Sequence, residues 1–224
     1  MNLSKLEMVF DPNDISGQIH IIGCGSVGST VAELLARYGL KNFTLWDMDE
    51  VESKNIVNQM FFANNIEAPK VEAVRDIICA INPDAKDEIV LKPNGWQGEM
   101  IRGYVFLAVD NIEIRKQFME ANKYNPNIKG VFDVRTGFHD AQCWAADWSK
   151  EKDRENLWNS MNFSHEDAQA GTPVSACGIV QGLAPTVRFV CCLAVTNFIN
   201  FATNIAPLKK MIVANPYTFN VTAA

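Results

Sequence analysis

The sequence predicts an α/β fold in which helices cover both faces of a mostly parallel β-sheet, with an antiparallel extension in the second half. Two observations predict it. Apolar strand-like segments alternate with helix-like segments through residues 19–134, which is the pattern of right-handed βαβ crossovers. A glycine-rich turn also joins the first strand to the first helix, as in Rossmann-like domains. We expect one domain over residues 1–224, a length that suits a single hydrophobic core.

The first βαβ unit carries the most specific signal. An apolar strand at Ile19–Ile22 leads into a turn that contains Gly23, Gly25 and Gly28, and a helix follows. A second strand at residues 42–46 ends in Asp47, nineteen residues after Gly28. Such glycines let backbone amides approach a phosphate at a helix N-terminus, and an acid at this distance is typical of a ribose-binding carboxylate. The unit therefore predicts a nucleotide site without naming the nucleotide.

The remaining elements follow in order along the chain. We expect a polar loop at 50–65, a helix at 69–81, a strand at 89–92, a fully buried strand at 104–109, a helix at 112–123, and strands at 129–134 and within 136–148, the last pair antiparallel. Residues 150–171 are polar without a clear period, so we expect a flexible crossover there. A segment of small residues at 172–182 then leads into an apolar helix that runs to about residue 204.

Composition and charge exclude several functions. The net charge is −6, from 26 acidic against 20 basic residues without a basic run, which argues against nucleic-acid and membrane partners. The apolar tract at 183–202 contains Arg188 and Asn197, which would be costly in lipid, so we expect a buried helix. The six cysteines form no C-x-x-C pair and the three histidines are isolated. We therefore expect no zinc site and a reduced, cytoplasmic protein.

Four motifs carry a family resemblance. Asp47-Met48-Asp49 is followed by an N-x-x-N-Q element at residues 55–59, by Pro69-Lys70-Val71-Glu72, and by the D-N-x-x-x-R element at residues 110–115. In this order and spacing they resemble the ThiF/MoeB family, which is related to the ubiquitin-activating enzymes. The resemblance extends over roughly residues 15–202 and is more specific than any one motif.

The resemblance implies an activity and a set of site residues. Members of that family bind ATP and Mg²⁺, adenylate the C-terminal carboxylate of a small ubiquitin-like carrier protein that ends in glycine, and usually form homodimers. Carried over, it implies a phosphate loop at Gly23, Gly25 and Gly28, a ribose acid at Asp47 with Asp49 beside it, polar groups at Asn55 and Gln59, a catalytic phosphate-binding cation at Lys70, and a catalytic, Mg²⁺-associated acid at Asp110 next to Asn111.

This chemistry agrees with the scarcity of histidine. A carboxylate nucleophile is already ionised at neutral pH, so no general base has to activate it. The site has to neutralise phosphate charge and align the attack on the α-phosphorus. Lysine, a metal-associated acid and backbone amides suit that task.

The sequence also departs from the family pattern. Asn58 stands where many members have an arginine, and residues 1–18 lack the R-Y-x-R-Q element that members donate across a dimer. Arginine stabilises phosphate charge better than a neutral amide, so we expect a lower adenylation rate or a transfer of the duty to Lys54, Lys70, Arg135 or a partner chain. The paired-cysteine zinc site of many members is absent too.

Several assignments stay open at this level. Cys177 is either a carrier-accepting nucleophile or a small buried residue that packs where the chain re-enters the core. Cys191 and Cys192 are expected to be packing residues, as members of an apolar helix. Arg115 is expected to anchor its helix or pair with an acid, and Arg135 either faces the site or holds the following hairpin.

Two other functions compete with adenylation. The chain could be a nucleotide-binding partner protein of the same family that is catalytically weakened by the lost arginines. It could instead be an NAD(P)-dependent oxidoreductase, although none of the histidines lies in an evident catalytic motif for hydride transfer.

Overall fold

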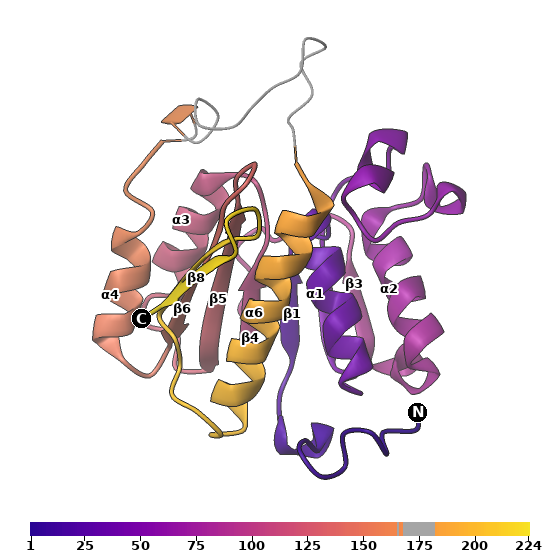
Figure 1. The fold of residues 1–224 in the computed structure, drawn as a ribbon, viewed down its shortest axis with the longest axis horizontal. Helices are drawn as coiled ribbons and strands as arrows, with labels where there is room; N and C mark the ends of the chain where they lie inside the picture. Colours follow the sequence, from indigo (N-terminus) through magenta and orange to yellow (C-terminus); the bar gives the residue numbers. More distant parts are fainter. Residues whose placement is uncertain (165, 168–181) are drawn as a thin grey trace.

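One eight-stranded β-sheet forms the centre of the computed structural model, which describes residues 1–164, 166–167 and 182–224. The strand order is β3-β2-β1-β4-β5-β6-β7-β8, and the first five strands of the chain run parallel (Figure 1). Each of the last three is antiparallel to its neighbour. The strands are β1 (Ile19–Ile22), β2 (Phe43–Trp46), β3 (Ile89–Lys92), β4 (Gly103–Leu107), β5 (Ile128–Thr136), β6 (Ala141–Asp147), β7 (Met211–Asn215) and β8 (Asn220–Ala223). The predicted α/β fold with an antiparallel extension is confirmed.

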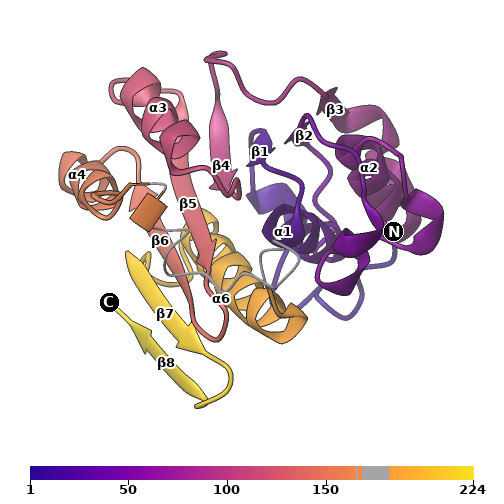
Figure 2. The same cartoon turned by 90° about the horizontal axis from the view of Figure 1, so that it is seen from above.

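Helices cover both faces of the sheet (Figure 2). One face carries α1 (Ser26–Arg37), α2 (Lys70–Ile81) and α6 (Ala184–Ala202), and the other carries α3 (Ile112–Asn122) and α4 (Glu151–Asn159). Within the described residues, the 3-10 helix η1 (Pro12–Asp14) precedes β1, and η2 (Ser53–Val57), η3 (Ala63–Asn65) and η4 (Pro83–Glu88) lie in the connections. Strand β4 is buried on both faces, since Phe106 packs in the first core and Leu107 in the second, as its continuous apolar run predicts.

Helix α6 belongs to the core. Phe198 packs edge-on against Phe106 and Phe132 of the sheet, with ring centroids 5.4 and 5.5 Å apart. By length and composition α6 could also cross a membrane, but 50% of its apolar window is buried within the protein. Contacts with α1, β5 and β6 account for that burial, so the predicted buried helix is confirmed.

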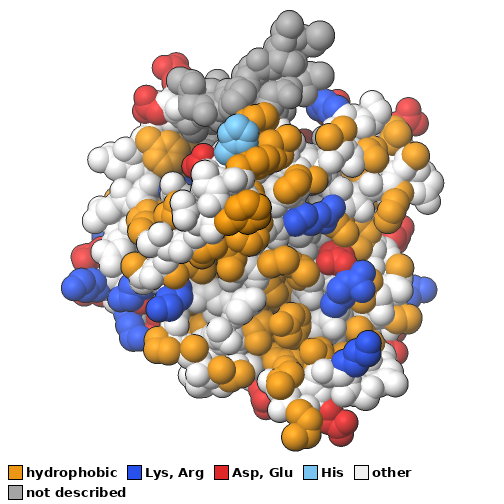
Figure 3. Space-filling model, in the orientation of Figure 1, with side chains coloured by type: hydrophobic (Ala, Val, Ile, Leu, Met, Phe, Trp, Pro, Cys, Tyr) orange, Lys and Arg blue, Asp and Glu red, His pale blue; other side chains and the backbone are white. Residues whose placement is uncertain are grey.

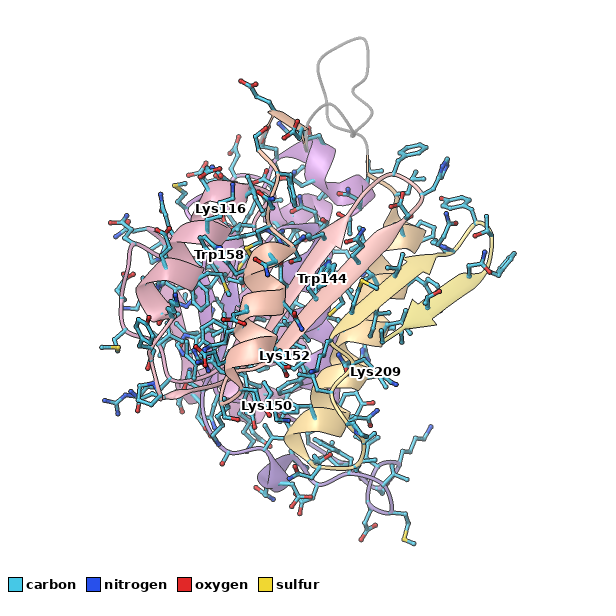
Figure 4. The ribbon with its side chains drawn as sticks, turned by 90° about the vertical axis from the view of Figure 1, so that its left-hand side faces the viewer. Lys116, Trp144, Lys150, Lys152, Trp158 and Lys209 are labelled. Atoms are coloured by element: carbon cyan, nitrogen blue, oxygen red, sulfur yellow. The ribbon has the colours of Figure 1, made fainter. Side chains whose placement is uncertain are left out.

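Two parts of the prediction are wrong. The expected irregular segment at 150–171 contains α4, which lies against β6 with Lys150 and Lys152 near its first turn (Figure 4). Its pattern is weak because only Asp153 and Leu157 are buried, and the Asp153 carboxylate pairs with Lys210 at 2.6 Å, a partner distant in sequence. The hairpin of β7 and β8 after α6 was not predicted at all.

Candidate nucleotide-binding site

The turn after β1 requires glycine at two positions for steric reasons. Gly23 has φ +94°, and a Cβ there would lie 2.7 Å from the Ala108 backbone at the end of β4. A Cβ on Gly28 would lie only 1.8 Å from the Gly23 carbonyl oxygen. Gly25 differs, because its Cβ would meet only the Gln59 Nε2, at 3.9 Å. Gly23 and Gly28 therefore pack the turn, whereas Gly25 leaves open space above it.

That open space lies at the N-terminus of α1. Gly25 is the N-cap residue, no side chain caps the helix, and its first turn has no acidic residue. The first backbone N–H groups of a helix have no partner within the helix, and the helix dipole adds partial positive charge there. The end of α1 can therefore bind an anion such as a phosphate. It lies at the carboxyl ends of the neighbouring strands β1 and β4, where the strand order reverses, as in other open α/β sheets that bind ligands.

Asp47 joins the end of β2 to this turn. Its Oδ2 accepts a hydrogen bond from the Cys24 amide at 2.6 Å, and its Oδ1 accepts one from the Asp49 amide at 2.9 Å. Burial raises the pKa of Asp47, while these two hydrogen bonds act in the opposite direction. The predicted ribose acid is thus held rigidly beside the glycine turn.

Lys70 reaches the same place from the first position of α2. Its Nζ lies 2.7 Å from the Asp49 Oδ2, and its amide donates to the Asp49 carbonyl at 2.9 Å. The Lys70 side chain is only 10% exposed, against 62% for Asp49. The charge of Lys70 also lowers the pKa of Asp47 and of the Cys24 thiol, although burial dominates both groups. The structure therefore brings the predicted cation next to the glycine turn.

The segment at 55–60 covers the end of α1. The Asn55 Oδ1 accepts from the Glu52 amide at 2.8 Å, so this buried side chain closes the turn of η2. Gln59 extends over Gly25, and its buried Oε1 has no hydrogen-bond partner in the part of the chain that the structure describes. The Met60 amide donates to the Ser29 hydroxyl at 3.2 Å and so ties the segment to α1.

Asp110 and Asn111 lie just after β4. Asp110 is exposed and makes no hydrogen bond or ion pair with the described residues. The Asn111 Oδ1 accepts from the Glu113 amide at 2.8 Å and caps α3, so this oxygen is engaged in local structure. The Arg115 Nε donates to the Val109 carbonyl at 3.0 Å, which holds the backbone immediately before Asp110.

Arg115 and Arg135 both bind the fully buried Asp133 of β5. Arg115 therefore anchors α3 and pairs with an acid, as expected. Arg135 also donates to the Ser160 carbonyl at 2.8 Å and connects β5 to the end of α4. This connection to α4 is a role that neither of the two alternatives considered from sequence included.

The cysteines divide by burial. Cys24, Cys143 and Cys191 are buried, and burial raises the pKa of the Cys143 thiol to about 12. Cys192 is exposed, so the expectation that it packs in the core is wrong: its position on α6 faces away from the sheet. Cys177 lies outside the described residues.

The described residues fit a magnesium–nucleotide. Gly25 leaves space, the Gln59 Oε1 needs a donor, and the exposed Asp110 carboxylate has no partner among the described residues. In the described ranges no group of three or more His, Cys, Asp or Glu side chains could hold a metal. Mg²⁺ commonly binds through one or two carboxylates together with substrate phosphates, so such a cluster is not required.

One further cation lies in this region and is not among the site residues expected from the sequence. Arg188 of α6 contacts Thr30 of α1 and Met60. The signal was present, because an arginine in an otherwise apolar helix needs a polar neighbour. In the sequence alone, this arginine argues only against a membrane span.

The fold is of the doubly wound α/β class, and the candidate nucleotide site lies where the strand order of its sheet reverses. The model of the ThiF family matches residues 15–224, and the chain belongs to that family.

Individual relatives differ in what they do. The ubiquitin-like modifier-activating enzyme 5 of Caenorhabditis briggsae is 37% identical over 90 residues, 40% of this chain and 21% of that protein. The tRNA threonylcarbamoyladenosine dehydratase of Haemophilus influenzae is 33% identical over 160 residues, 65% of this chain and 61% of that protein. The chain thus spans less than two thirds of the length of either relative.

Solved structures share the fold at low identity. PaaA superposes with a TM-score of 0.70 at 13% identity, and E. coli MccB with ATP superposes with a TM-score of 0.66 at 16% identity. Each alignment covers 95% of this chain and 65% of the other. At these identities the likeness concerns the fold alone.

Proposed function

We propose that this protein uses ATP and Mg²⁺ to adenylate the C-terminal carboxylate of a small ubiquitin-like carrier protein that ends in glycine. The observation that carries the proposal is the convergence of Lys70, Asp47 and the glycine turn at the uncapped N-terminus of α1. Membership of the ThiF family and the likeness to ubiquitin-like modifier-activating enzymes support it. The fold neighbour MccB was crystallised with ATP and with MccA.

The residues of this chain suit that reaction. Bound ATP and Mg²⁺ supply the adenylyl group and charge neutralisation: the carboxylate oxygen attacks the α-phosphorus, and the bond to the β-phosphate breaks to release pyrophosphate. The open N–H groups of α1 would bind phosphate oxygens, and Lys70 would offset their charge. Asp110 would associate with the metal. Asp47 would accept hydrogen bonds from the ribose while it holds the turn.

Partners and localisation form part of the same proposal. We propose a cytoplasmic homodimer, in which the outer face of α6 contributes to the interface. Cys192 and Thr196 on that face are exposed, and hydrophobic side chains gather along it (Figure 3). Sedimentation at micromolar concentration should give the mass of two chains, whereas a monomer would contradict the dimer.

The test is ATP–pyrophosphate exchange in the presence of a Gly-ended carrier. Wild-type protein should catalyse exchange, and Asp110→Ala should abolish it. Glu113→Ala is the matched control. Glu113 is an exposed acid in the first turn of α3, so its substitution should leave exchange unchanged.

Other results would favour the competing functions. ATP binding without exchange would indicate the catalytically weakened partner protein. Tight NAD binding without ATP binding would overturn the proposal in favour of an oxidoreductase. Exchange that survives Asp110→Ala would show that the acid has been misassigned.

A second candidate follows from the dehydratase relative, which matches a larger share of this chain than the activating enzyme does. Its named substrate is a tRNA nucleoside that also carries a carboxyl group, so the same activation could precede loss of water. The net charge of −6 disfavours a tRNA surface. Incubation of tRNA bearing that nucleoside with ATP, followed by mass spectrometry for the loss of one water, distinguishes the two substrates.

A further inference from the structure

We infer that Arg188 supplies the phosphate-binding charge that Asn58 cannot provide. The inference rests on the proposed function, because it assigns a residue to the binding of ATP. It concerns a side chain on α6, far in sequence from the N-x-x-N-Q element that lacks the arginine.

Contacts place Arg188 on the segment that covers the phosphate turn. Its Nη1 lies 3.4 Å from the Thr30 Oγ1 and contacts the Met60 sulfur. The Thr30 hydroxyl in turn donates to the Ser26 carbonyl at 2.8 Å, in the first turn of α1. Met60 directly follows Gln59, whose side chain lies over Gly25. The guanidinium therefore lies against the second turn of α1 and against the segment that covers the open end of that helix.

The start of α6 also lies beside residue 58. The Asn58 Nδ2 is 2.6 Å from the place where a Cβ on Gly182 would stand, just before α6 begins. Position 58 and the start of α6 are thus neighbours, and Arg188 of α6 contacts Met60, two residues further along the covering segment. An arginine at position 188 can serve the region that an arginine at position 58 would serve.

The charge of Arg188 has no counter-ion among the described residues. Its two partners are a hydroxyl and a thioether, and no carboxylate there lies within ion-pair distance of it. A half-buried cation without an anion is held at a cost in free energy. An anion at the end of α1 would attract the guanidinium away from such uncharged partners, since a guanidinium and a phosphate carry opposite charges and can form two parallel hydrogen bonds.

Two of the three other cations considered for this duty are engaged elsewhere, and the third, Lys70, already has a phosphate-binding role in the proposed function. Lys54 pairs with Glu52 at 2.9 Å in an exposed position, and Arg135 binds Asp133 and the end of α4. Lys70 is paired with Asp49, on the opposite side of the turn from α6 along the sheet order. Arg188 is the cation here whose charge is not offset by a described acid.

Calorimetric titration with ATP, AMP and adenosine, without a carrier, tests the assignment by binding alone. Arg188→Gln should weaken ATP binding 10- to 100-fold while adenosine binding changes less than about threefold, because the guanidinium contacts phosphate only. The second variant, Asn58→Arg with Arg188→Gln, should recover most of the ATP affinity. Lys54→Gln is the matched control and should bind ATP as the wild type does.

Each outcome decides the matter. If wild-type protein binds ATP and Arg188→Gln binds it equally well, the inference is overturned, and an equal loss for ATP and adenosine would show that Arg188 only packs α6 against α1. Failure of Asn58→Arg to restore ATP affinity would also count against it. Wild-type binding with the predicted phosphate-specific loss, but without pyrophosphate exchange, would overturn the proposed function and leave the inference standing. Absence of ATP binding by the wild type would overturn both the proposed function and the inference about Arg188.

Discussion

The Cys24 amide donates a hydrogen bond of 2.6 Å to the Asp47 carboxylate, and this contact locks the turn after β1 to the end of β2. Two strands that are neighbours in the sheet are thereby joined at the edge where the nucleotide is expected. One acid serves the architecture of the site and is also the predicted ribose ligand. Its substitution should therefore affect stability and binding separately.

Asp47→Ala should lower the free energy of unfolding by about 1–3 kcal/mol, because the buried Cys24 amide loses its acceptor. Asp47→Asn keeps one acceptor oxygen and should cost less. Urea denaturation measures both, with the exposed Glu50→Ala as control. Unchanged stability of Asp47→Ala would show that water replaces the carboxylate at no cost.

Lys70→Met should reduce ATP affinity at least tenfold and change stability little. Methionine retains the apolar stem of the buried lysine, and the Asp49 partner that remains is largely exposed to water. Titration with ATP and thermal unfolding report the two effects. A variant that binds ATP normally would show that Lys70 serves only to hold Asp49.

Two glycine substitutions should behave in opposite ways. Gly28→Ala forces a Cβ against the Gly23 carbonyl and should destabilise the fold by several kcal/mol, since backbone has to move. Gly25→Ala adds a methyl group in open space and should leave the unfolding free energy nearly unchanged while it weakens ATP binding. Equal destabilisation by both would mean that Gly25 is needed for the turn itself and not for the approach of a phosphate.

Stability should fall below neutral pH because of His20. Burial lowers its pKa to about 4, and its ring accepts from the Trp46 indole while its Nε2 lies 3.0 Å from the Arg102 carbonyl. The unfolded chain takes up a proton near pH 6.5, whereas the folded chain does so only near pH 4. The unfolding free energy should therefore drop by on the order of 3 kcal/mol from pH 7 to pH 4 through this residue.

Denaturation of wild type and His20→Gln across that range measures the contribution. The variant should show a shallower pH dependence, because glutamine has no charge to gain. Parallel curves for the two proteins would assign the acid sensitivity to other groups.

Elements with strong local patterns were predictable. The apolar run of β4 indicates a strand buried on both faces, and Gly23 and Gly28 occur where the turn leaves no room for a Cβ. Helix α4 was not predictable in this way, because its buried face consists of a single leucine and an aspartate. The aspartate is stabilised by Lys210, and nothing in the local sequence reveals that partner.

By itself the sequence determined the α/β fold, the glycine turn, the order of the motifs and the absence of an arginine at position 58. These features depend on residues close together in the chain, whose spacing sets strand, turn and helix. Only the tertiary structure decided that Asn111 caps a helix, that Arg135 connects β5 to α4, and that Arg188 lies against the segment covering the phosphate turn. The physical reason is that such roles depend on which side chains meet across the folded sheet, and that distance in space is unrelated to distance along the chain.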